Sequence, residues 1–144
     1  MSAQSRRLAG ILLILIPTVM YGGWTLLQML IHDPAYMGNA LRQNLWRAGH
    51  AHAGVLLILS LVSLLYVDQA NLSPGWKAIA RAAIPIAAIL MPAGFFLSMI
   101  RPSDTAPSEL IYLTYAGIVP LALGVILLGI GLVRPPKKAS AAAT

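Results

Sequence analysis

The sequence predicts an all-α integral membrane protein, a four-helix up-and-down bundle, and three observations support this fold class. Apolar residues make up 58% of the 144 residues, and charged residues make up only 10%. A soluble domain carries about 25% charged residues, so a chain this poor in charge cannot cover a water-facing surface. In addition, four long stretches contain no charged residue, and the basic residues stand mainly at the ends of these stretches.

The four uncharged stretches define the expected membrane spans. A bilayer core of about 30 Å is crossed by roughly 20 apolar residues in a helix, and a single segment satisfies its backbone groups in lipid only as a helix. The predicted spans are 8–31, 48–67, 82–100 and 110–133. They form one domain, 1–134, followed by an Ala/Ser-rich segment, 135–144, that is predicted to be a disordered cytoplasmic tail.

The connections between the spans are short, which favours antiparallel neighbours in an up-and-down order. The first connection contains Pro34 and Gly38, and a short interfacial helix is expected within it, at 40–46. Small residues in the later spans are expected to let helices approach closely. These residues are Gly54, Ala83, Ala87, Gly124 and Gly129.

The distribution of basic residues predicts the orientation of the chain in the cell's inner (plasma) membrane. One side holds seven of them, namely Arg6, Arg7, Lys77, Arg81, Arg134, Lys137 and Lys138. The other side holds three, namely Arg42, Arg47 and Arg101. Both termini are therefore expected to be cytoplasmic. The net charge of +6 fits contact with anionic lipid headgroups. Nucleic acid is not an expected partner, because no basic patch is interleaved with aromatic residues.

The sharpest pattern is a polar stripe on the first span. At 100° per residue, one arc of about 80° holds five polar residues. They are Thr18, Tyr21, Thr25, Gln28 and His32. Polar groups are costly in hydrocarbon, so this stripe is expected to face the protein interior. Interhelical hydrogen bonds alone would account for it, and a binding site is the alternative.

The second span opens with His50 and His52, two residues apart. On a helix these side chains point about 160° apart, so both cannot bind one metal ion. His52 is expected to face inward, because its helix face also carries Ser63 and Tyr66.

The remaining candidates lie toward the same membrane face. The candidate binding residues are Tyr21, Gln28, His32, Arg47, His50, His52, Tyr112 and Tyr115. The opposite half of the bundle is almost purely apolar, so any site is expected near the outer face. The absence of cysteine excludes thiolate metal sites and cysteine catalysis, and no catalytic residue is predicted.

The segment 47–54, RAGHAHAG, carries a resemblance. In a four-helix chain of this size it resembles a group of small, uncharacterised bacterial membrane proteins. Its Gly-His-Ala-His core is also similar to histidine-bearing helices in the catalytic subunits of haem-copper oxidases and nitric oxide reductases. That second likeness covers about eight residues, and it implies a haem-binding role for His50 or His52.

Three functions are compatible with these patterns. The first is a non-catalytic accessory or structural membrane component, whose partners are the lipid bilayer and a larger membrane complex or a homo-oligomer. The alternative is a haem- or metal-binding protein in which His32 and His52 hold haem b or a transition metal, since imidazole is a common ligand for such metals. A further alternative is a site for a quinone or a lipid-like small molecule.

Overall fold

The computed structural model confirms an all-α protein with four helices long and apolar enough to cross a membrane. It describes residues 1–135, so all of the predicted tail except Pro135 lies outside the described residues. Two short helical turns precede the second and fourth long helices. The elements are α1 (Ala3–His32), α2 (Pro34–Met37), α3 (Ala40–Tyr66), α4 (Pro74–Leu97), η1 (Glu109–Ile111) and α5 (Tyr112–Val133).

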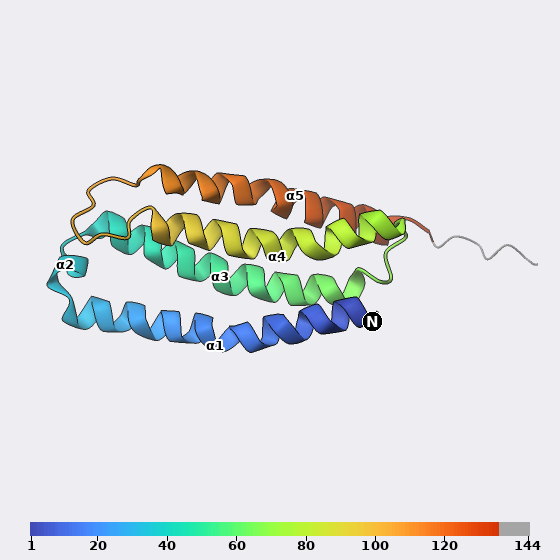
Figure 1. Ribbon diagram of the computed structural model, residues 1–144, viewed down its shortest axis with the longest axis horizontal. Helices are drawn as coiled ribbons and strands as arrows, with labels where there is room; N and C mark the ends of the chain where they lie inside the picture. The colour runs from blue at the N-terminus through green and yellow to red at the C-terminus, as the bar shows by residue number, and fades with distance from the viewer. Residues whose placement is uncertain (136–144) are drawn as a thin grey trace, which may run out of the picture.

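The long helices run alternately in opposite directions (Figure 1). The start of α1, the α3–α4 connection and the end of α5 therefore lie together, at what we call the terminal end. The α2 turn and the α4–α5 connection lie together at the opposite end, which we call the α2 end.

Three of the long helices begin before the predicted membrane spans, and the first of them, α1, begins at Ala3 instead of residue 8. The expected interfacial helix 40–46 and the span 48–67 form one continuous helix, α3, which Asn39 caps by accepting a hydrogen bond from the Arg42 amide at 3.0 Å. Similarly, α4 begins at Pro74, a favoured residue for a first turn. The helices are longer at these ends than the predicted spans because a charged side chain marks the edge of the hydrocarbon, whereas the helix itself continues into the polar region.

Close backbone contact holds α4 and α5 together. A Cβ added to Gly94 of α4 would lie 2.5 Å from the backbone nitrogen of Thr114 in α5. The Thr114 hydroxyl donates a hydrogen bond to the Met91 carbonyl at 3.2 Å. Gly124 packs against Ala83 in the same way, whereas Gly129, also predicted to pack, is exposed with nothing near it.

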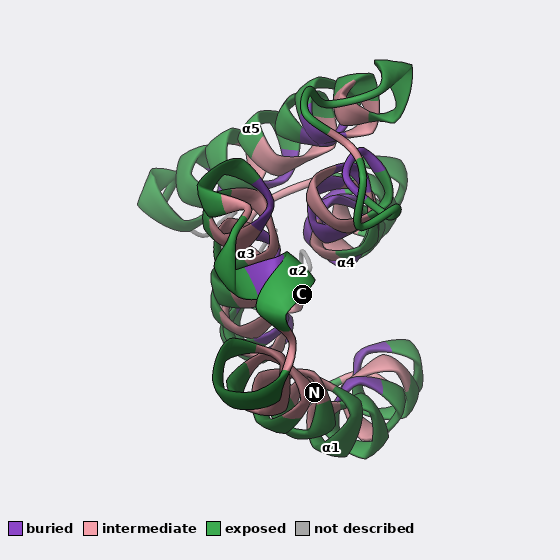
Figure 2. Cartoon of the chain, turned by 90° about the vertical axis from the view of Figure 1, so that its left-hand side faces the viewer, coloured by how far each residue is buried: buried purple, intermediate pink, exposed green. Residues whose placement is uncertain are grey.

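In contrast, α1 lies at the edge of the molecule. Figure 2 shows α3 and α4 between α1 and α5. Only Ser5 and Leu12 of α1 are buried, and its main contact is with α3. Leu12 joins the core cluster at the terminal half, where Leu57, Leu64 and Leu128 also lie.

An ion pair closes the terminal end. The Arg81 guanidinium lies 2.9 Å from the Asp68 carboxylate, and it donates a second hydrogen bond to the Ser5 hydroxyl at 2.9 Å. The Ser2 amide donates to Asp68 at 2.6 Å. Partial burial acts to raise the pKa of Asp68, but the hydrogen bonds from Ser2 and Arg81 outweigh it and lower this pKa to about 2. This network therefore holds the start of α1 against the α3–α4 connection.

Candidate functional site at the α2 end

A crevice lies between α1, α2 and α3 at the α2 end of the bundle. Its volume is about 300 Å³. Apolar residues of α1 form one wall, and polar residues of α2 and α3 form the other. The lining residues are Gly23, Leu26, Leu27, Leu30, Tyr36, Arg47 and His50.

The His50 ring lies directly over two glycines of α1. A Cβ added to Gly23 would stand 2.9 Å from His50 Nε2, and one added to Gly22 would stand 3.7 Å from Nδ1. The imidazole thus occupies space that any larger residue at position 23 would take. This glycine pair is what allows a histidine to sit between α1 and α3.

His52 faces a different helix. Its ring centroid lies 5.0 Å from that of Phe95 in α4. Its Nδ1 lies 2.8 Å from the Ala48 carbonyl oxygen of its own helix, which can only accept a hydrogen bond, so Nδ1 carries the proton. His50 and His52 therefore point toward α1 and α4 respectively, and only His50 lines the crevice.

The predicted pair of His32 and His52 has no support as a metal or haem site. His32 is exposed at the end of α1, whereas His52 packs against α4. Among residues 1–135 there is no group of three or more His, Cys, Asp or Glu side chains placed to hold a metal ion.

The polar stripe of α1 does not face the interior of a single chain, and this corrects the expectation drawn from the sequence. Tyr21 is 65% exposed. Tyr21 and Thr25 each stand two positions from Gly23, which contacts α3, so both point about 160° away from that contact. Gln28 stands two positions from both Leu26 and Leu30. These leucines line the crevice, so Gln28 also points about 160° away from it. The stripe lies on the side of α1 opposite α3.

The tyrosines of α5 are not part of the crevice. The rings of Tyr112 and Tyr115 lie against each other in a tilted arrangement with centroids 6.0 Å apart, and both side chains are exposed. They lie on α5, which packs mainly on α4 and not on α1. The predicted cluster is therefore divided between separate parts of the α2 end.

Two residues that sequence reasoning did not select, Tyr36 and Arg42, lie beside the crevice. Tyr36 is 1% exposed, and its hydroxyl has no hydrogen-bond partner in the part of the chain that the structure describes. Burial raises the pKa of Tyr36, while the positive charges of Arg47 and Arg42 act to lower it. The hydroxyl is therefore held neutral and able to donate a hydrogen bond.

Arg42 is 4% exposed and joins α3 to the end of α4. Its Nε and Nη2 donate to the carbonyl oxygens of Met99 and Ile100 at 3.0 and 3.1 Å. Its guanidinium lies 4.3 Å from the ring centroid of Trp46, while Nη1 has no hydrogen-bond partner among the described residues. The i, i+4 spacing of Arg42 and Trp46 was the available signal, because such residues are neighbours on a helix.

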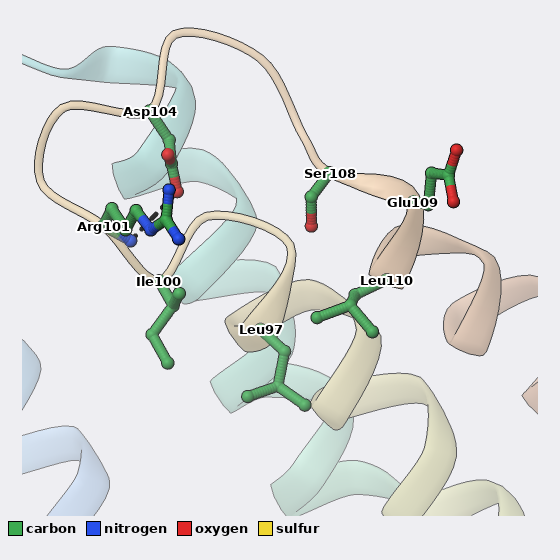
Figure 3. Close-up of a pocket in the computed structure, with 7 residues that line it drawn as sticks. All are labelled: Leu97, Ile100, Arg101, Asp104, Ser108, Glu109 and Leu110. Atoms are coloured by element: carbon green, nitrogen blue, oxygen red, sulfur yellow. Dashed lines mark hydrogen bonds between the residues drawn. The ribbon is translucent and has the colours of Figure 1, made fainter.

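A second hollow lies under the α4–α5 connection, with a volume of about 470 Å³. Figure 3 shows Arg101 beside Asp104, and Glu109 directed away from both. The Arg101 amide donates to the Asp104 carboxylate at 2.9 Å, which closes the turn of this loop. Its polar groups therefore serve the loop, and this hollow lacks the convergent donors of the crevice.

Comparison of the chain with protein-family models, with curated proteins and with solved structures found no match. A function therefore has to be inferred from the chain's own geometry.

Proposed function

We propose that the chain is a structural component of the inner membrane, with both termini cytoplasmic, that assembles with a second copy through the polar stripe of α1. The observation that supports this proposal is the position of the stripe. It lies on the side of α1 opposite α3. In one isolated chain Thr18, Tyr21 and His32 are exposed there, and Thr25 and Gln28 are partly exposed.

The stripe carries polar groups that its own helix leaves free. The hydroxyls of Thr18 and Thr25 donate to the carbonyls of Leu15 and Tyr21 within α1, at 2.7 and 3.0 Å. The side chains of Tyr21 and Gln28 take part in none of the hydrogen bonds formed by the described residues. Polar groups of this kind join helices in membranes, at about 1 kcal/mol for each hydrogen bond.

A second copy suits this face better than a different chain because the stripe is self-complementary. In a two-fold dimer with its axis along the membrane normal, the same residue of each copy lies at the same depth. The Tyr21 hydroxyl and the Gln28 amide each both donate and accept hydrogen bonds. Each can therefore pair with its own copy, and no like charges meet within the span.

Photo-crosslinking in the native membrane tests the proposal. Tyr21→p-benzoylphenylalanine keeps an aromatic ring on the stripe, and Met20→p-benzoylphenylalanine is the matched control. Met20 is similarly exposed, at 69% against 65% for Tyr21, but points about 100° away. We expect an adduct of twice the chain mass from position 21 and mainly lipid adducts from position 20.

Two outcomes would contradict the proposal. An adduct of position 21 with a different polypeptide would show that the partner is another subunit and not a second copy, as in the accessory role expected from the sequence. Equal lipid labelling from both positions would show that the polar stripe faces lipid and that the chain does not assemble through it.

A further inference from the structure

We infer that the crevice between α1, α2 and α3 binds the phosphate headgroup of an anionic phospholipid. The crevice lies on the opposite side of α1 from the polar stripe, because Leu30 points about 160° away from Gln28. This inference therefore does not depend on the assembly proposed above, and both surfaces of α1 can be occupied at once.

The polar wall of the crevice is built for an anion. Arg47 is exposed and carries a full positive charge, and His50 and Tyr36 stand beside it in the lining. Tyr36 is part of the lining, and its buried hydroxyl has no partner among residues 1–135, so it has a hydrogen bond still to donate. Asp33 caps the start of α2. Its carboxylate accepts hydrogen bonds from the amides of Ala35 and Tyr36 at 3.0 and 3.2 Å, so its negative charge is engaged by this turn. A guanidinium and a phosphate form a strong, charge-assisted pair. The lining formed by the described residues holds no carboxylate to pair with a choline ammonium, so a lipid of net negative charge suits it better than a zwitterionic one.

The apolar wall of the crevice suits an acyl chain. Leu27 and Leu30 line it and remain 51% and 43% exposed, so the crevice is open along α1 toward the hydrocarbon. Its volume of about 300 Å³ is at the small end for ligand sites. It holds a headgroup and the first part of a chain, and the rest of the chain stays in the bilayer. The head of a quinone is uncharged and would leave Arg47 without a partner, so the phosphate is the better match.

Native mass spectrometry of the full chain in detergent tests this inference. Dioleoyl phosphatidylglycerol is titrated against dioleoyl phosphatidylcholine, and inorganic phosphate is then added as a competitor. We expect the chain to retain phosphatidylglycerol preferentially, and Arg47→Gln to weaken that binding about tenfold, which corresponds to about 1.4 kcal/mol. Arg101→Gln is the matched control, because Arg101 is also exposed at the α2 end but does not line the crevice.

A second variant tests the apolar wall. Gly23→Leu places a side chain where His50 Nε2 lies 2.9 Å from the first added carbon, so it fills the crevice. We expect it to lose phosphatidylglycerol with its helical circular dichroism retained. If this variant is unfolded, the comparison of Arg47→Gln with Arg101→Gln decides alone.

Three outcomes would overturn the inference. Equal retention of the two lipids would show that the crevice has no preference for an anionic headgroup. Equal effects of the two arginine variants would place the lipid outside the crevice. Displacement of phosphatidylglycerol by millimolar inorganic phosphate would show that the site takes a free phosphate and that the acyl chain contributes nothing.

Discussion

The helices α1 and α4 have the same mean hydropathy over their most apolar windows, yet they are buried to very different extents. Eight of the 24 residues of α4 are buried, against two of the 30 residues of α1. Apolarity therefore determines that both helices enter the membrane, because lipid is as favourable for them as protein. Small residues determine which of them packs tightly, and α4 meets α5 through Gly94, Gly117 and Gly124.

The largest loss of stability is expected from a substitution at the close contact between α4 and α5. Gly94→Ala places a Cβ 2.5 Å from the Thr114 backbone nitrogen, so the two helices must move apart. We expect it to lower the free energy of unfolding by about 3 kcal/mol, the upper end for overpacking. Gly129→Ala is the control, because nothing lies within 4 Å of a Cβ there, and we expect it to be neutral or slightly stabilising. Unfolding in mixed SDS micelles, followed by circular dichroism, measures both, and equal stabilities would refute the close contact.

A smaller loss is expected at Arg42, which ties α3 to the end of α4. Arg42→Met removes the hydrogen bonds to the Met99 and Ile100 carbonyls, and we expect a loss of about 2 kcal/mol in unfolding free energy. Arg101→Met changes an exposed arginine at the same end and is expected to have almost no effect. The same unfolding assay compares them. The Met99 carbonyl also accepts from the Trp46 indole at 3.2 Å, so a neutral Arg42→Met would show that the Ile100 carbonyl is satisfied without Arg42.

The contact between α1 and the rest of the molecule is expected to depend weakly on pH. The pKa of Asp68 in the folded protein is about 2, below the ordinary value of 3.8. A lowered pKa stabilises the fold while the carboxylate is charged, so this contribution is complete above about pH 4 and is lost as the pH falls toward 2. We expect Asp68→Asn to cost about 1 kcal/mol at pH 7 and to remove this part of the acid sensitivity. A pH series of unfolding curves for both proteins is the measurement, and parallel curves between pH 4 and 2 would contradict it.

The smallest effect on the stability of a single chain is expected from the polar stripe. Gln28→Leu replaces an amide that makes no hydrogen bond within the described chain, so the unfolding free energy should change by less than about 0.5 kcal/mol. In the membrane, the same change should reduce the dimer adduct formed from position 21. A variant that unfolds easily would instead show that Gln28 supports the fold of one chain.

The sequence predicted the four spans because twenty or so uncharged residues in a row have no other common explanation. It could not predict the edge position of α1, because the period of its polar residues specifies a shared face but not what covers that face. Arg47 and His50 were selected because they lie toward the same membrane face as the other polar candidates, and both line the crevice. Tyr36 and Arg42 were missed because they lie in what looked like a connection, and their burial depends on α2 and on the end of α4.

The network at the terminal end has a consequence for how the chain is made. The Ser2 amide binds Asp68, which is 66 residues later in the sequence. At synthesis rates of about 5–20 residues per second, roughly 3 to 13 seconds separate the emergence of these two residues from the ribosome. All of α1 and all of α3 lie between these two residues, so α1 emerges before its anchor has been made. The start of α1 can therefore take its docked position at the terminal end only after both α1 and α3 have been synthesised.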